Sequence, residues 1–267
     1  GGGAGVPNQS SHSTNRVAWV HIPKCGSSFG TTVAHFANSS LPATAVYGST
    51  DRNLTHDEEL KFDFSGTFIE EWPEEQYFQG GLLWGGHEGK FGGHHRVTQE
   101  DFQQWRGRFV ALFREPAARM QSAFLYIQEL GWWGSQEVGK FCESYKGEQT
   151  RMIAGQADGW EAKSASDPPN TALALERLKG FMFVGLTEEY DLSVCLFHAM
   201  FGGQSLRAEF NNLRPTSSDT HQEANPFEGC DDEADRLLHS EVNKTFWSRV
   251  EEYTVTRESC QALIDSL

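Results

Sequence analysis

Short runs of apolar residues alternate along the chain with longer stretches in which apolar residues recur about every 3.6 positions. The runs are short enough to be buried strands and lie at residues 16–22, 82–84, 108–113 and 181–184. Stretches with helical spacing follow these runs, and the last of them occupies the chain from Asp231 onward. Strands that alternate with helices predict an α/β fold with a central, mainly parallel sheet flanked by helices.

Residues that favour helix ends mark several boundaries. Helices are expected to begin at Ser27 or Ser28, at the capping-box sequence 98–101, at Pro116 and at Thr187. The helix after Thr187 is expected to run to Phe201, where Gly202 and Gly203 end it. A further helix is expected over residues 171–179. Two strand–loop–helix units result, one at the N-terminal end and one in the middle of the chain.

Composition divides the chain unevenly. Residues 1–15 are rich in Gly, Ser and Asn, which predicts a disordered tail, and the opening glycines without a Met indicate a trimmed or artificial end. Residues 16–267 are expected to form a single domain. Within it, residues 131–170 are rich in Gly, Ser, Asp and Trp, which favours a variable insertion that is mobile or contacts substrate.

The net charge of −15 and the isoelectric point near 5.1 limit the kinds of partner. Nucleic acids and anionic membranes bind basic surfaces, so neither is expected to bind here. No apolar run reaches the roughly 18 residues that cross a membrane. A neutral or cationic partner fits this charge better than a polyanion.

The five cysteines show no CxxC pair and no zinc-like spacing. Cys195 lies in an apolar helical stretch and is interpreted as a buried thiol, whereas Cys230 and Cys260 are candidates for pairing in a secretory compartment. Four N-x-[ST] sequons, at Asn8, Asn38, Asn53 and Asn243, also indicate a secreted or lumenal glycoprotein.

The loop at residues 23–28 joins a predicted strand to a predicted helix. Backbone N–H groups converge at such a helix start, and the helix dipole adds partial positive charge, so the loop is a candidate anion site. Lys24 supplies a full positive charge, and Ser27 and Ser28 supply hydroxyl groups. Because Lys24 precedes Gly26, the order differs from that of an ATP- or GTP-binding Walker A loop.

A second candidate phosphate site follows the strand at residues 108–113. Arg114 lies where this strand ends, and Ser122 lies about two helical turns further along the next helix. An arginine and a hydroxyl that face each other can hold a phosphate through charge-assisted hydrogen bonds.

These two segments resemble one family. HIPKCGSS at residues 21–28 is similar to the HIPKTGGTS loop of membrane-anchored carbohydrate sulfotransferases and their bacterial and algal relatives, and LFREPAARMQSAFLY at 112–126 is similar to their LLRDPVERFLSAFLY. The resemblance implies a P-loop-like sulfotransferase fold that uses 3′-phosphoadenosine 5′-phosphosulfate (PAPS), leaves adenosine 3′,5′-bisphosphate (PAP) and needs no metal. The implied cofactor-binding residues are Pro23, Lys24, Cys25, Gly26, Ser27, Ser28, Arg114 and Ser122, with Cys25 in place of the usual Thr.

Further resemblances suggest the acceptor side. GHEGKFGGH at residues 86–94 is similar to a GHxPFGxH segment of relatives, which implies His87 as the catalytic base, with Glu88 as an alternative base or substrate contact. QTRMIAG at 149–155 is similar to part of NLQTRMLAG, so Arg151 is a candidate contact to cofactor or acceptor, or a structural residue. His94 and His95 are a weak candidate metal pair. Trp160, in the insertion expected near the acceptor site, is a candidate for stacking on a sugar or for packing.

The sequence therefore predicts a PAPS-dependent sulfotransferase that transfers a sulfuryl group in line to an acceptor hydroxyl, with Lys24 beside the departing phosphate. A carbohydrate is the expected acceptor; a lipid, another small molecule, or a non-catalytic PAPS- or glycan-binding role are the alternatives. A nucleoside phosphotransferase is disfavoured by the loop order. The Golgi lumen is the expected location if an N-terminal anchor has been removed, and the cytoplasm otherwise.

Overall fold

The computed structural model describes residues 17–47, 83–84, 93–129, 137–161, 166–211 and 225–267 of the 267-residue chain. Within these residues one sheet is formed by β1 (Val17–Trp19), β2 (Leu83–Trp84), β3 (Phe109–Phe113) and β4 (Phe181–Leu186). Its strand order is β2-β1-β3-β4, and neighbouring strands are parallel. The expected α/β class is confirmed.

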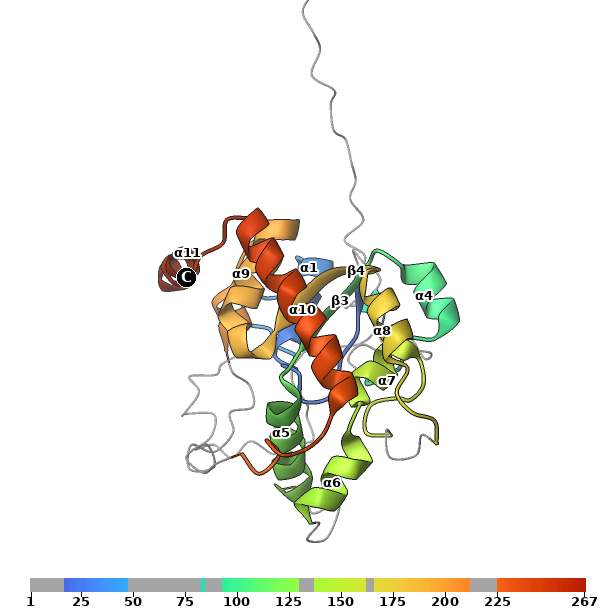
Figure 1. The fold of residues 1–267 in the computed structure, drawn as a ribbon. Helices are drawn as coiled ribbons and strands as arrows, with labels where there is room; N and C mark the ends of the chain where they lie inside the picture. The colour runs from blue at the N-terminus through green and yellow to red at the C-terminus, as the bar shows by residue number, and fades with distance from the viewer. Residues whose placement is uncertain (1–16, 48–82, 85–92, 130–136, 162–165, 212–224) are drawn as a thin grey trace, which may run out of the picture.

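Helices cover both faces of this sheet. Figure 1 shows α10 crossing in front of β3 and β4, with α7 and α8 beside it, and α1 behind the sheet. The helices of the described residues are α1 (Phe29–Ala37), α4 (Gln99–Trp105), α5 (Pro116–Glu129), α6 (Val138–Tyr145), α7 (Glu148–Ala154), α8 (Thr171–Leu178), α9 (Tyr190–Phe201), α10 (Glu233–Glu252) and α11 (Arg257–Ser266), with short 3₁₀ helices η3 (Thr187–Glu189) and η4 (Arg207–Phe210). Among these, none is long and apolar enough to cross a membrane.

The main core lies around β3. All five of its residues are buried, as expected for a central strand between two parallel neighbours. Phe29 of α1 packs against Phe183 of β4 and Phe197 of α9, with ring centroids 5.5 Å apart in both pairs. These aromatic contacts fix the start of α1 relative to the sheet.

A second apolar cluster joins α5 and α6 to the chain before α10. Phe141 of α6 contacts both Phe124 of α5 and Phe227, with centroids 5.2 Å and 5.7 Å away. Cys142 in α6 forms a disulfide with Cys230 in the same region. This cluster attaches the C-terminal part of the chain to the helix that follows β3.

The cysteine interpretation was wrong. Cys195 is not a thiol but forms a disulfide with Cys260, because α11 folds back against α9 and brings the two residues together. Cys230 therefore pairs with Cys142 and not with Cys260. Cys25 remains a free, buried thiol.

Most predicted helix starts are confirmed, with one correction. Thr98 forms the capping box with Asp101, and Pro116 begins α5. Thr187 does not cap α9: its hydroxyl donates to the backbone oxygen of Phe113 (3.1 Å), and α9 begins three residues later, after η3. The side chain of this threonine thus ties the end of β4 to the end of β3.

The segment predicted to be a variable insertion is helical in part. Residues 131–170 contain α6 and α7, and every residue of α7 is buried. Helix α7 contacts α8 and α10, so it belongs to the layer in front of the sheet. Its sequence EQTRMIA hides this role because four of its seven residues are polar. Two of these, Glu148 and Gln149, bond to Arg119 and to the backbone of Arg114, respectively.

Candidate functional site

The two candidate phosphate segments follow neighbouring strands. The chain passes from β1 to β2 on one side and then returns to β3 on the other side of β1. The chain therefore leaves the carboxyl ends of the neighbouring strands β1 and β3 in opposite directions. In open parallel sheets such a divergence opens a crevice between the two loops, and ligands bind there. Residues 23–28 follow β1, and Arg114 follows β3. The fold brings the two segments to one place.

The loop backbone adopts two left-handed conformations. Lys24 has a φ of 62° and Gly26 a φ of 76°. A Cβ at Gly26 would lie 2.8 Å from Leu112 Cδ1, so only glycine fits. A lysine in this region is strained by roughly 1–2 kcal/mol, and such strain concentrates at functional sites.

Backbone N–H groups of the loop are open to a ligand. The N–H groups of Gly26 and Ser27 have no acceptor among the residues that the structure describes. Helix α1 begins just after them, and its first turn contains no acidic residue. Ser28 occupies the N-cap position but its side chain makes no capping bond. Unsatisfied donors and an uncompensated helix dipole together form a site suited to an anion.

Arg114 contacts the loop directly. Its Nη1 donates to the backbone oxygen of Lys24 at 3.3 Å, which leaves other guanidinium donors of Arg114 for a ligand. No carboxylate lies within ion-pair distance of Arg114 in the described part of the chain. Burial lowers the pKa of this arginine. The second cation of the site is therefore partly desolvated and lacks an ion-pair partner among the described residues.

Lys24 lies against α5. Its Nζ sits 4.2 Å from the ring centroid of Tyr126, in a cation–π contact. Ser122 and Tyr126 are one turn apart on α5 and so share a face of this helix. Ser122 therefore lies on the same face of α5 as Tyr126, which contacts Lys24, and its pairing with Arg114 stays a prediction.

Cys25 faces inward and contacts Gln149 of α7. Its Sγ lies 3.4 Å from Gln149 Oε1, and only 3% of the side chain is exposed. Burial raises the pKa of the thiol far above its usual value, so it remains protonated and donates. The resemblance of residues 149–155 implicated only Arg151, and no local pattern marked Gln149 itself.

Two histidines support the other side of the loop. His21 is buried, and its Nε2 lies 2.9 Å from Ser27 Oγ, within hydrogen-bond distance. Its ring stacks on that of Trp19, with the two ring centroids 4.4 Å apart. His94 Nδ1 bonds to the backbone oxygen of His21 at 2.8 Å. His94 thus packs on the loop, and the described residues contain no His, Cys, Asp and Glu group that could hold a metal.

Trp160 extends this aromatic support. Its ring stacks on Tyr126 at 5.9 Å and meets His94 edge-on at 6.1 Å. Next to it, a Cβ on Gly159 would lie 2.5 Å from Pro23 Cγ, so this turn packs closely on the buried loop proline. The packing role foreseen for Trp160 is present, beside the loop.

The remaining predicted residues do not join this group. His87 and Glu88 lie outside the described residues. Arg151 is buried and donates through Nη1 to the backbone oxygen of Asp167 at 2.5 Å. It lines a separate cavity of about 500 Å³ that also contacts Lys146 and Asp232. The structure therefore does not bring Arg151 together with Lys24 and Arg114.

Arg119, the second arginine of the motif, is structural. It is fully buried, ion-paired to Glu148, and donates to the backbone oxygen of Tyr145 at 2.9 Å. Asp235 of α10 lies 3.8 Å from its Nε. The group joins α5, α7 and α10 beneath the candidate site.

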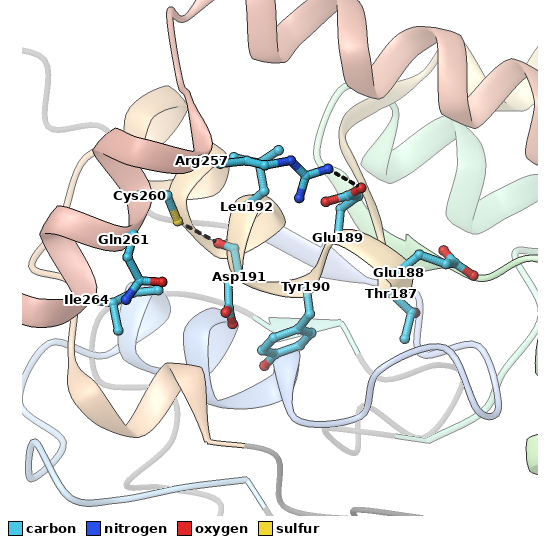
Figure 2. Close-up of a pocket in the computed structure, with 10 residues that line it drawn as sticks. All are labelled: Thr187, Glu188, Glu189, Tyr190, Asp191, Leu192, Arg257, Cys260, Gln261 and Ile264. Carbon is cyan, nitrogen blue, oxygen red and sulfur yellow. Dashed lines mark hydrogen bonds and ion pairs between the residues drawn. The ribbon is translucent and has the colours of Figure 1, made fainter. Parts of the chain in front are cut away.

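A cavity of about 410 Å³ adjoins the loop on the side of η3 and α11. Figure 2 shows Thr187, Tyr190 and Asp191 lining it from one side and Gln261 and Ile264 from α11. A Cβ at Gly26 would lie 3.5 Å from Thr187 Oγ1 and 3.8 Å from Tyr190 Cδ2, so these two residues separate the cavity from the loop. Its carboxylates (Glu188, Glu189 and Asp191) make it unsuited to a phosphate.

No family model, no curated protein and no solved structure matches this chain. The interpretation of the site therefore depends on its own residues and geometry.

Proposed function

We propose that this protein is a sulfotransferase of the P-loop-like fold, which transfers a sulfuryl group from PAPS to an acceptor hydroxyl. The observation that carries the proposal is the contact between Arg114 and the backbone of Lys24 at the carboxyl ends of β1 and β3. Two cationic residues from distant segments meet there around open backbone donors. A nucleotide with phosphates at both ends needs such an arrangement.

The residues present fit this nucleotide. The N–H groups of Gly26 and Ser27, with the hydroxyls of Ser27 and Ser28 and the charge of Lys24, would hold the 5′-phosphosulfate. Arg114 and Ser122 would hold the 3′-phosphate. PAPS supplies an activated sulfuryl group whose bond to the 5′-phosphate breaks as its bond to the acceptor oxygen forms. Lys24 would neutralise the charge that develops on the departing phosphate.

His87 is proposed to accept the proton of the acceptor hydroxyl. A histidine suits this step because its ordinary pKa lies near neutral pH. A carbohydrate is the acceptor we propose, in keeping with the net charge of −15, which disfavours a polyanion. The two disulfides support a site of action in the secretory pathway, where such bonds form and persist.

Calorimetry with PAP in the absence of divalent metal tests the proposal. We expect micromolar binding, followed by transfer of labelled sulfate from PAPS to a hydroxyl in an acceptor screen. Folded protein that binds no PAP would contradict the proposal and leave a glycan-binding role. Binding of PAP without transfer to any acceptor would indicate a non-catalytic relative.

The substitution His87→Ala tests the base. We expect turnover to be abolished while PAP affinity changes by less than about twofold, because a base acts on the acceptor and not on the nucleotide. Glu88→Gln is the matched comparison, and it should keep most of the turnover. If His87→Ala kept turnover and Glu88→Gln lost it, the base would be Glu88.

A further inference from the structure

Gln149 connects the two halves of the candidate site. This residue of α7 is fully buried, and its side-chain amide reaches both segments. Its Oε1 accepts from the backbone N–H of Arg114 at 3.1 Å and from the thiol of Cys25 at 3.4 Å. Its Nε2 donates to the backbone oxygen of Arg114 at 3.0 Å. One side chain thus bonds to the end of β3 and to the middle of the loop after β1.

The bridge has a rigid base. Asp235 of α10 accepts from the backbone N–H groups of Gln149 (3.1 Å) and Thr150 (2.8 Å), and it is fully buried. Its Oδ2 also lies 3.5 Å from Gln149 Nε2. These bonds fix the start of α7, and with it the glutamine side chain, to the longest helix of the layer in front of the sheet.

The contacts require an amide. Arg114 presents an N–H and a carbonyl oxygen to the same side chain, so one end must accept and the other must donate. A carboxylate in place of Gln149 would lose the donor and would face Asp235 with like charge. An apolar side chain of the same length would keep the packing and lose every bond.

We propose that Gln149 is a positioning residue that fixes the distance between the loop and Arg114, so that the 5′- and 3′-phosphates of one nucleotide bind as a unit. The inference rests on the proposed function. A site whose halves are held at the right separation before binding pays less conformational entropy when the second phosphate is bound. Gln149 itself touches no ligand.

The experiment compares three nucleotides in two variants. PAP carries both phosphates, whereas adenosine 5′-phosphate and adenosine 3′-phosphate carry one each. In Gln149→Met we expect PAP affinity to fall about tenfold, as coupling energies in hydrogen-bond networks allow, and the affinities of both monophosphates to change less than about twofold. Gln156→Met is the control, because the side chain of Gln156 bonds to the backbones of Pro168 and Asn170, away from the loop.

The thiol end of the bridge gives a second test that does not disturb α7. Cys25→Ala removes one donor and should weaken PAP by about threefold while the affinities of both monophosphates change less than about twofold, and Cys25→Ser, which keeps a donor, should lose less PAP affinity than Cys25→Ala. These variants decide the question if Gln149→Met fails to fold.

The outcomes separate the two proposals. Equal losses for all three nucleotides in Gln149→Met, or no loss for PAP, would overturn the positioning role while wild-type binding of PAP still supports the proposed function. If wild-type protein binds none of the three nucleotides, the proposed function is wrong and this inference falls with it.

Discussion

Arg114 and Arg119 lie five positions apart at the junction of β3 and α5, yet they occupy opposite environments. Arg119 is fully buried among carboxylates, with Glu148 and Asp235 close to its guanidinium. Arg114 is only partly buried, bonds to a carbonyl oxygen, and has no ion-pair partner among the described residues. Compensation of charge, more than the residue type, therefore distinguishes a structural arginine from one that is prepared for an anion.

The pKa shifts follow the same division. Burial opposes the charged form of both arginines, and for Arg114 it lowers the pKa. For Arg119 the nearby carboxylates of Glu148 and Asp235 outweigh burial, and the pKa is raised. The charge of Arg119 is thus stabilised within the fold, whereas that of Arg114 gains most from a ligand.

Replacing Arg119 should give the largest effect on stability. Arg119→Met leaves the carboxylate of Glu148 buried without its partner, so we expect the free energy of unfolding to fall by about 3–5 kcal/mol in urea denaturation. Arg257→Met is the control, because that arginine pairs with Glu189 at the surface and should matter little. A near-normal Arg119→Met protein would show that the ion pair is not needed for the fold.

Replacing Arg114 should weaken ligand binding and leave stability intact. Arg114→Met removes a partly desolvated charge that has no ion-pair partner in the described part of the chain, so the free energy of unfolding should stay the same or rise. PAP affinity should fall by roughly 2–4 kcal/mol in calorimetry, as for loss of a charge-assisted contact to phosphate. Unchanged PAP affinity would mean that Arg114 does not hold the 3′-phosphate.

A smaller effect on stability concerns Asp232, one of the carboxylates near Arg119. Burial, and next the carboxylate of Asp235, raise the pKa of Asp232 to about 7. The ordinary value for an aspartate in an unfolded chain is about 3.9. Between these values the folded protein binds a proton that the unfolded chain releases, so this group lowers the free energy of unfolding as the pH rises from about 4 to about 7.

Asp232→Asn should remove this contribution. Its side-chain oxygen can still accept from the backbone N–H of Gly147, as Asp232 does at 2.9 Å. The melting temperature of the variant, relative to wild type, should therefore be higher at pH 8 than at pH 5. Parallel melting curves across this range would show that Asp232 titrates normally in the folded protein.

The sequence predicted the elements whose signals are local. β3 is a continuous buried run. Its burial requires apolar residues, and this apolar run is the signal by which the strand was recognised. The first strand was predicted too long: pairing ends at Val20, whose N–H bonds to Val110, although His21 and Ile22 stay buried beneath the loop. Burial alone cannot separate a strand from the buried residues that follow it.

Contacts between distant residues could not be predicted. Cys25 and Gln149 are 124 positions apart, and the polar sequence of α7 resembles that of a surface helix. The pairing of Cys195 with Cys260 depends on where α11 docks, which no spacing of cysteines encodes. By contrast, the family resemblance implied that Lys24 and Arg114 bind one nucleotide, and in the structure they meet because each follows a strand and β1 and β3 are parallel neighbours.

The unpaired cysteine has a chemical consequence for a chain whose other four cysteines are oxidised. Thiol–disulfide exchange and oxidation proceed through the thiolate, and the enclosed, protonated sulfur of Cys25 offers almost none. A sulfhydryl can therefore persist in the loop under conditions that cross-link the rest of the molecule. Reagents that label accessible thiols should leave the native protein untouched and modify it only once the loop opens.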